Sequence, residues 1–180
     1  MSAYVICDFD TSGAILRDET PSRLPGRRMT PQESRIQESL ADLRVLAAED
    51  NEINRKVLSS LLQIAGVEPH VVVDGAEALA AWRLRRYDLI LMDVHMPRMD
   101  GLTATRLIRK EERLQGWRPV PIIAVTSAAD QYERQAHTLG LDGVVAKPIN
   151  LQVLFRTIER TLRAAQKQGE SRSFAPRAAG

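Results

Sequence analysis

The chain has 180 residues, of which 44% are hydrophobic and 27% charged, and its formal net charge of +2 is too small to favour nucleic acid as a partner. A single cysteine excludes an internal disulfide framework, and no apolar run approaches the roughly 18 residues that a membrane span needs. The amino terminus lacks a basic segment followed by an apolar one, so these features together predict a cytoplasmic protein without a membrane anchor.

Residues 1–42 are predicted to form an N-terminal extension. Residues 4–7 can form a short strand, and Asp8 follows it directly. Asp8 to Thr11 resembles the first motif of haloacid-dehalogenase-type phosphatases, and the resemblance implies a nucleophilic role for Asp8. That family needs a large α/β domain after the motif, whereas residues 20–31 here are polar and contain proline. A loop or linker is therefore the favoured interpretation of this segment.

A helix is predicted where the extension joins the rest of the chain. Thr30 can cap it, Pro31 suits the first helical position, and Glu33 completes a capping box. Ile36 and Leu40 then lie on one face, so this helix is expected to pack on the following domain or to pair with a second copy.

Residues 43–168 alternate strictly between apolar strands and amphipathic helices. The strands are predicted at residues 43–48, 71–73, 89–93, 122–126 and 143–146, and the helices at residues 53–64, 76–85, 101–112, 131–139 and 151–162. Such alternation predicts an α/β domain, a flavodoxin-like doubly wound sheet of five parallel strands in the order 2-1-3-4-5. Nearly continuous apolar strands agree with a sheet covered on both faces. Residues 169–180 lack this periodicity and are predicted to form a disordered tail.

Polar residues follow four of these strands at their carboxyl ends. Glu49 and Asp50 follow the first strand, Asp93 ends the third, Thr126 ends the fourth and Lys147 follows the fifth. Each residue alone is equally consistent with a cap or a turn. Because the carboxyl ends of parallel strands share one edge, the residues together predict a single functional site.

This set of residues favours phosphoryl chemistry. Carboxylates that converge in a small space repel one another and either share protons or bind a cation, and oxygen ligands suit Mg²⁺. The three histidines are scattered, so no zinc site is predicted. An ionised Asp93 needs no general base to attack a phosphoryl group. A hydroxyl from Thr126 and the ammonium of Lys147 would then stabilise the phosphoryl oxygens.

The pattern resembles the receiver domain of two-component response regulators over about residues 43–168. The matching motifs are Ala48-Glu-Asp-Asn51, Leu91-Met-Asp-Val-His-Met-Pro97, Met99-Asp-Gly101, Ala124-Val-Thr-Ser127 and Lys147-Pro148. The segment Asp50-Asn-Glu-Ile-Asn54 resembles in particular the receivers of hybrid histidine kinases.

The resemblance implies a role for each site residue. Asp93 is the implied phosphoacceptor, and Thr126 and Lys147 contact the phosphoryl oxygens. The implied Mg²⁺ ligands are Glu49, Asp50, Asp93 and the backbone carbonyl of His95. The implied partner is a histidine kinase or a histidine phosphotransfer protein, and the output is protein–protein contact or onward phosphotransfer.

One position departs from the family's pattern. The aromatic residue that usually stands three positions before the lysine is replaced by Val144. Phosphorylation of Asp93 is expected to survive, since Val144 is not a ligand, but the usual aromatic switch is not available. We expect backbone shifts near Ser127 and the fourth helix to carry the output, or the receiver to pass its phosphate on. His95 and Ala128 occupy positions that tune dephosphorylation in the family.

Three functions stay open at this stage. The first is a phosphorylated receiver that is not an enzyme beyond its own phosphorylation and dephosphorylation, and it is favoured because the site residues are all present. The second is a receiver-like interaction module that no longer cycles phosphate, and the missing aromatic at Val144 keeps it open. The third is a phosphatase that acts on external substrates through Asp8 or Asp93. The sequence leaves a homodimer open.

Overall fold

The structure is a computed structural model that describes residues 40 and 42–171, with side chains through residue 168. Asp8, the helix expected after Thr30 apart from Leu40, and residues 172–180 of the predicted tail lie outside the described residues. Residues 169–171, which were predicted to belong to the tail, are part of the last helix. The described elements are β1 (Val45–Ala48), α2 (Glu52–Ile64), β2 (His70–Val72), α3 (Gly75–Leu84), β3 (Leu89–Asp93), α4 (Gly101–Gln115), β4 (Ile122–Thr126), α5 (Ala129–Glu133), α6 (Ala136–Leu139), β5 (Gly143–Ala146) and α7 (Leu151–Ser171).

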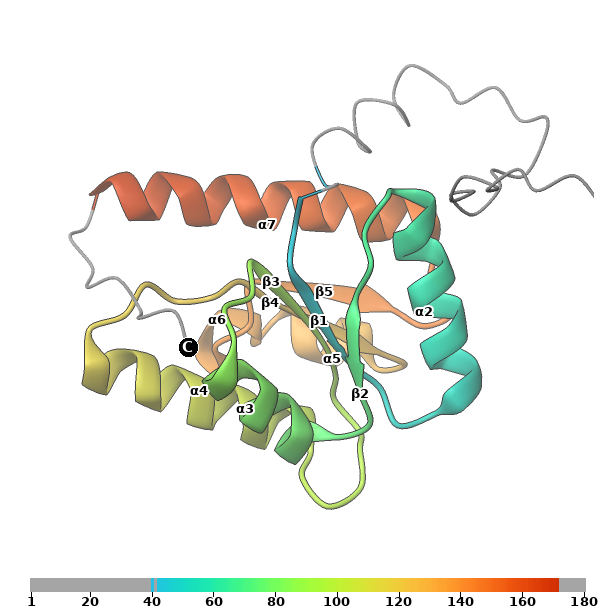
Figure 1. Cartoon of the computed structure of the whole chain (residues 1–180), viewed down its shortest axis with the longest axis horizontal. Helices are drawn as coiled ribbons and strands as arrows, with labels where there is room; N and C mark the ends of the chain where they lie inside the picture. Colours follow the sequence, from blue (N-terminus) through green and yellow to red (C-terminus); the bar gives the residue numbers. More distant parts are fainter. Residues whose placement is uncertain (1–39, 41, 172–180) are drawn as a thin grey trace, which may run out of the picture.

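The five strands form one parallel sheet in the order β2-β1-β3-β4-β5 (Figure 1). β3 lies at its centre and pairs Leu91 with Ala47 of β1 and with Ile123 of β4. The predicted fold class and strand order are confirmed. This order places the carboxyl ends of β1 and β3 next to each other, at the point where the winding of the sheet reverses.

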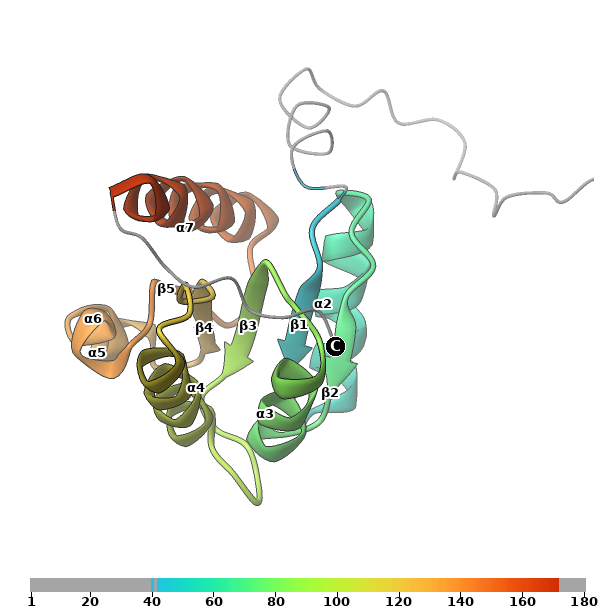
Figure 2. The same cartoon turned by 60° about the vertical axis from the view of Figure 1, so that its left-hand side comes forward.

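Successive residues of each strand point to opposite faces of the sheet, and each face has its own core. Ile90 and Met92 pack with residues of α3 and α4, whereas Leu89 and Leu91 pack with residues of α2 and α7. The helices accordingly lie in two layers, with α2 and α7 on one face and α3 and α4 on the other (Figure 2). Leu40 is almost fully buried with the α2 and α7 residues, so the chain before β1 contributes to that core.

Side-chain caps fix where helices begin. The carboxylate of Asp74 accepts a hydrogen bond from the Glu77 amide at the start of α3, and Asp100 caps α4 through the Thr103 amide in the same way. Sequence periodicity predicted one helix over residues 131–139, but two short helices, α5 and α6, cover this region. The Gln135 amide donates to the Tyr132 carbonyl three residues back, which tightens the chain and separates the two helices.

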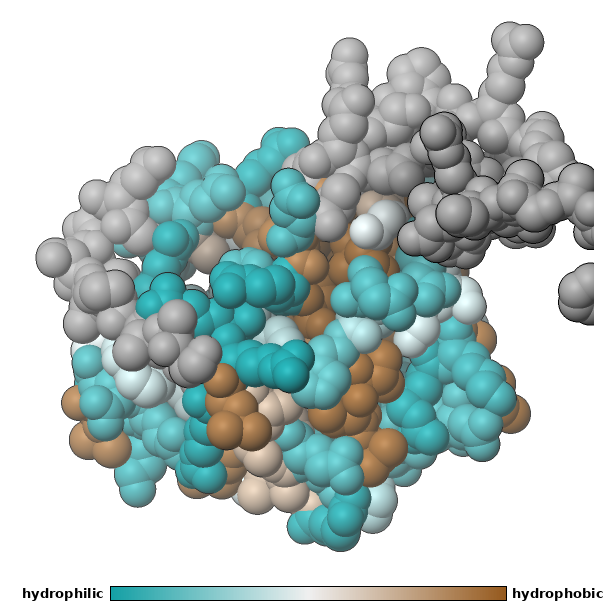
Figure 3. Space-filling view, in the orientation of Figure 1, coloured by the Kyte–Doolittle hydropathy of each residue, from teal (hydrophilic) through white to brown (hydrophobic). Residues whose placement is uncertain are grey.

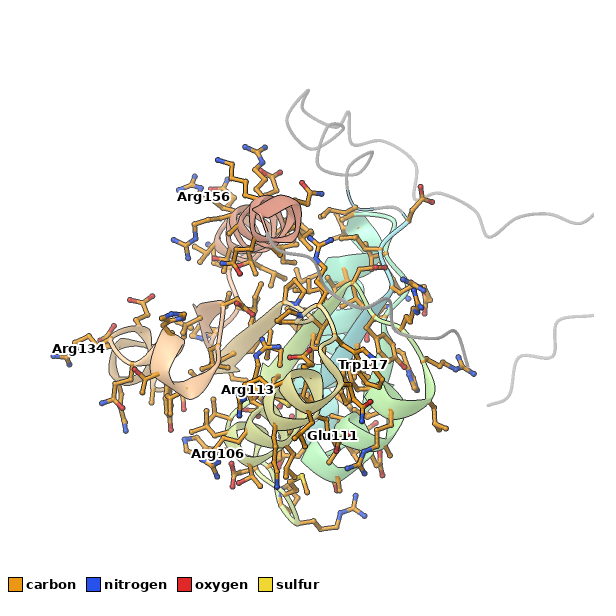
Figure 4. All side chains as sticks on the ribbon, turned by 90° about the vertical axis from the view of Figure 1, so that its left-hand side faces the viewer. Arg106, Glu111, Arg113, Trp117, Arg134 and Arg156 are labelled. Atoms are coloured by element: carbon orange, nitrogen blue, oxygen red, sulfur yellow. The ribbon has the colours of Figure 1, made fainter. Side chains whose placement is uncertain are left out.

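Hydrophilic residues cover much of the face seen in Figure 3, where they surround a band of apolar surface. Figure 4 shows three arginines that project away from the ribbon: Arg106 on α4, Arg134 directly after α5, and Arg156 on α7. Trp117 lies near α3, where its ring contacts that of Trp82. None of the helices in the described residues combines the length and apolar character that a membrane crossing requires.

Candidate functional site

The predicted site residues meet at the carboxyl edge of the sheet. Carboxylate oxygens of Glu49, Asp50 and Asp93 lie within 4.8 Å of one another. Glu49 and Asp93 are buried and Asp50 is exposed, so the cluster sits at the protein surface with one side open to water. These oxygens form the one group of three metal-binding side chains within the described residues.

The first turn of α2 holds the β1 end of the cluster. Asn51 caps α2 by accepting hydrogen bonds from the amides of Ile53 and Asn54. The Asn54 side chain reaches back and donates to Oε1 of Glu49 at 2.9 Å. Arg55 donates to the carbonyls of Glu49 and Asp50 at 3.0 and 2.6 Å. The acidic pair is therefore fixed by the helix that follows it.

Lys147 provides the positive charge of the site. Its Nζ lies 2.6 Å from Oδ2 of Asp93 and 2.7 Å from Oε2 of Glu49. Burial disfavours the charged amine, but the hydrogen bonds to Asp93 and Glu49 outweigh this effect and raise the pKa of Lys147. Lys147 is therefore a fixed cation that links the ends of β1, β3 and β5. Three carboxylates against one ammonium leave a net negative charge.

Thr126 lies at the end of β4 and is fully buried. Its hydroxyl oxygen accepts a hydrogen bond from the Ala128 amide at 3.2 Å, and its carbonyl accepts one from the Lys147 amide at 2.9 Å. These two bonds tie Thr126 to the start of α5 and to the end of β5.

The loop between β3 and α4 folds tightly under Asp93. The Gly101 amide donates to the Val94 carbonyl at 3.0 Å, and a Cβ atom at position 101 would lie only 2.0 Å from the Asp93 carbonyl oxygen. Only glycine permits this approach. The loop also places the His95 amide 3.2 Å from Oδ1 of Asp93, so the two oxygens of Asp93 are held from different sides, by His95 and by Lys147.

The structure thus brings the side chains of Glu49, Asp50, Asp93 and Lys147 together at this edge. The His95 amide contacts Asp93, and Thr126 is joined to Lys147 through its backbone. The chemical roles of these residues stay predictions, and Asp8 lies outside the described residues. Sequence reasoning missed the support from Asn54 and Arg55, and it missed the contact between the His95 and Tyr132 rings. For Asn54 and Arg55 a signal existed, since both stand in the first turn of a helix that starts directly after the acidic pair. Tyr132 gave no such signal because it lies 37 positions after His95.

The donor set of the cluster determines which ligand it suits. Three carboxylates, two of them buried, concentrate negative charge that one lysine does not balance. The exposed Asp50 leaves space for water, and the cluster contains no sulfur or imidazole ligand. A hard, partly hydrated divalent cation fits such a cluster, so the site can hold a metal ion.

Comparison with known proteins gives one consistent result. A family model described as the response regulator receiver domain matches residues 45–159. Hybrid signal transduction histidine kinase G of Dictyostelium discoideum is 39% identical over 125 residues, which cover 68% of this chain and 4% of that kinase. The polar-differentiation response regulator DivK of Brucella anthropi is 35% identical over 119 residues, which cover 66% of this chain and 94% of DivK. The chain spans between 4% and 19% of the length of the curated histidine kinases it resembles.

Solved structures agree with this result. The receiver domain of the sensor histidine kinase PA1611 from Pseudomonas aeruginosa, with a magnesium ion coordinated in its active site cleft, aligns with a TM-score of 0.59 and 36% identity, covering 67% of this chain and 98% of that domain. The receiver domain of Ssk1 from Saccharomyces cerevisiae, crystallised with the histidine phosphotransfer protein Ypd1, aligns with a TM-score of 0.62 and 31% identity, covering 68% of this chain and 91% of the matched one.

Proposed function

The chain belongs to the response regulator receiver domain family of two-component signalling, and from this premise we propose that Asp93 accepts a phosphoryl group from a phosphohistidine. The observation that carries the proposal is the placement of Asp93, whose carboxylate is buried at the central strand end with Lys147 on one oxygen and the His95 amide on the other. This arrangement gives the Asp93 carboxylate a fixed orientation.

The reaction needs few groups from the protein. One oxygen of Asp93 forms a bond to phosphorus while the bond between phosphorus and the donor's imidazole nitrogen breaks. The imidazole keeps the electron pair and takes up a proton, and the product is an aspartyl phosphate. Negative charge spreads over the phosphoryl oxygens during transfer, and the ammonium of Lys147 and the hydroxyl of Thr126 are the groups that stabilise it. The Thr126 oxygen accepts a hydrogen bond from the Ala128 amide, which leaves the hydroxyl proton able to donate to a phosphoryl oxygen.

Mg²⁺ is the cofactor that this proposal assigns to the acidic cluster. Glu49, Asp50 and Asp93, with the backbone carbonyl of His95, would hold it, and the fit rests on the uncompensated negative charge of the three carboxylates. When bound, Mg²⁺ neutralises charge on the phosphoryl group. The magnesium ion in the PA1611 receiver domain supports the assignment.

The proposed partner is a histidine kinase or a histidine phosphotransfer protein. The similarity to the Ssk1 receiver domain, which was crystallised with Ypd1, supports a partner of this kind. Phosphorylated Asp93 would then either change contacts with a protein or return its phosphate to a phosphotransfer protein. We propose that the domain does not turn over external phosphoesters and that the cytoplasmic location predicted from the sequence holds.

Intact mass tests the proposal after incubation with Mg²⁺ and acetyl phosphate. We expect one phosphoryl adduct on the wild-type protein, none on Asp93→Asn, and none on the wild-type protein in EDTA. Asp88→Asn is the matched control, because Asp88 directly precedes the same strand and pairs with Arg44 at the opposite end of the sheet. A folded wild-type protein that acquires no adduct would contradict the proposal and favour the non-cycling interaction module.

A further inference from the structure

A ring contact links the phosphoacceptor loop to α5. The centroids of the His95 and Tyr132 rings are 6.2 Å apart and their planes are inclined by 58°, within the range of favourable tilted aromatic pairs. Tyr132 is 8% exposed, whereas the side chain of His95 is exposed between the buried Val94 and Met96. Tyr132 is therefore a buried, fixed side chain against which a solvent-exposed ring rests.

The same two residues are also linked to the site through their backbones. The His95 amide donates to Oδ1 of Asp93 at 3.2 Å. On the other side, the Tyr132 amide donates to the Ala128 carbonyl, and the Ala128 amide donates to the Thr126 hydroxyl at 3.2 Å. Tyr132 is thus joined to Asp93 by way of His95 and to Thr126 by way of Ala128.

Lys147 closes this set of contacts into a cycle. Its amide donates to the Thr126 carbonyl at 2.9 Å, and its ammonium contacts Oδ2 of Asp93 at 2.6 Å. Within the cycle, the His95 amide holds Oδ1 of Asp93 and the Lys147 ammonium holds Oδ2. The contact between the His95 and Tyr132 rings is the one aromatic contact in the cycle. In this cycle, the Tyr132 ring is the one group that joins His95 to α5.

We propose that Tyr132 is a positioning residue for phosphorylation of Asp93. Packed against the His95 ring, it fixes the β3–α4 loop so that the His95 amide orients the Asp93 carboxylate for attack. This inference rests on the proposed function and adds to it a residue outside the motifs of the site. Loss of the Tyr132 ring releases the His95 ring from α5, while the Gly101–Val94 hydrogen bond still holds the rest of the loop. No group that touches the phosphoryl donor is removed.

The size of the expected effect follows from the strength of the contact. A tilted aromatic pair that orders the loop is expected to change the phosphorylation rate by about two- to tenfold, where tenfold corresponds to about 1.4 kcal/mol. The change should fall on the rate of adduct formation from acetyl phosphate. Tyr132→Phe keeps the ring and should stay within about twofold of the wild-type rate, since the ring geometry is unchanged.

The experiment is a double-mutant cycle on the full chain. Adduct formation is measured by intact mass for the wild-type protein, Tyr132→Leu, His95→Ala and the double variant, with Tyr132→Phe as the conservative control. Leu keeps an apolar side chain at position 132, which limits the cavity that loss of the ring leaves. We expect Tyr132→Leu to slow the reaction in the wild-type background and to have no further effect once His95 is Ala. Equal slowing in both backgrounds, or no slowing at all, would overturn the inference.

A spectroscopic measurement tests the contact independently of phosphorylation. The chain has three histidines, so the imidazole proton signals can be resolved by NMR and that of His95 assigned from the His95→Ala spectrum. We expect the His95 signal to shift in Tyr132→Leu and to stay near its wild-type position in Tyr132→Phe. His70, which stacks on Tyr87, serves as the internal control and should not move. An unchanged His95 signal in Tyr132→Leu would refute the pairing.

The two proposals fail in different ways. A wild-type protein without a phosphoryl adduct removes the proposed function and with it the role of Tyr132. A wild-type protein that is phosphorylated normally, while Tyr132→Leu acts additively with His95→Ala, leaves the proposed function intact and removes only the positioning role.

Discussion

Replacing Asp50 with Asn tests the electrostatics of the acidic cluster, because the change removes one negative charge and keeps the shape of the side chain. The oxygens of Asp50 lie within 4.8 Å of those of Glu49 and Asp93. Two unit charges at this separation repel by about 1–2 kcal/mol at an effective dielectric constant of roughly 40–80, which suits an exposed group. Lys147 offsets part of the repulsion, so we expect the metal-free variant to be more stable than the wild-type protein by about 1 kcal/mol.

Mg²⁺ should reverse this order. A ligand that binds only the folded protein stabilises it by about 2.7 kcal/mol at a hundred times its dissociation constant. Asp50→Asn loses a charged ligand and should bind Mg²⁺ more weakly, so its own gain at the same concentration is smaller. The wild-type protein should therefore become the more stable of the two in excess Mg²⁺, although it is the less stable one in EDTA.

Urea unfolding measures both effects, with tryptophan fluorescence as the signal, to which Trp117 and the buried Trp82 both contribute. The free energy of unfolding is compared for the wild-type protein, Asp50→Asn and Asp42→Asn, each in EDTA and in excess Mg²⁺. Asp42 is an exposed aspartate outside the cluster and controls for the substitution itself. If Asp50→Asn is less stable than the wild-type protein in EDTA, charge repulsion does not act at Asp50 as we expect. If Asp50→Asn gains as much stability from Mg²⁺ as the wild-type protein does, Asp50 does not bind the metal.

Three further predictions concern the stability of the fold. The pKa of Lys147 is raised in the folded protein, so its ion pairs stabilise the fold fully below pH 10.5, and this stability is lost as pH rises through the folded-state pKa. The urea midpoint of unfolding should therefore fall less steeply at alkaline pH for Lys147→Met than for the wild-type protein. An equally steep fall in both proteins would contradict this. Burial raises the pKa of Glu112 above 4.5, so its contribution is fully present below that pH and declines as pH rises through the folded-state value. As pH rises from acid to neutral, the free energy of unfolding of Glu112→Gln, measured in urea, should increase relative to that of the wild-type protein. A difference that does not change with pH would contradict this. Gly101→Ala should lower the free energy of unfolding by about 3 kcal/mol or more, because its Cβ would overlap the Asp93 carbonyl. Gly116→Ala has open space around it and should lower it by about 1 kcal/mol, because its backbone is left-handed. Similar losses of stability for the two variants in thermal unfolding would refute the steric argument.

Local patterns in the sequence were sufficient for the architecture. β3 and β4 have the bounds that their apolar runs predicted, and the alternation of strands and helices predicted the parallel order of the sheet. Parallel topology brings the ends of the strands to one edge, so the sequence alone could assign Asp93 and Lys147, 54 positions apart, to one site. Predictions of this kind depend only on periodicity, apolar runs and cap residues, which the chain carries locally.

The tertiary structure alone decided the contacts between side chains from different elements. Arg109 pairs with Glu112 one turn along its own helix, which local spacing allows, but it also pairs with Asp142 before β5, which no local pattern indicates. The packing of Tyr132 on His95 likewise joins two residues that are remote in the chain. These contacts depend on distances between residues that are remote in the chain, and periodicity does not encode those distances because it repeats within a single element.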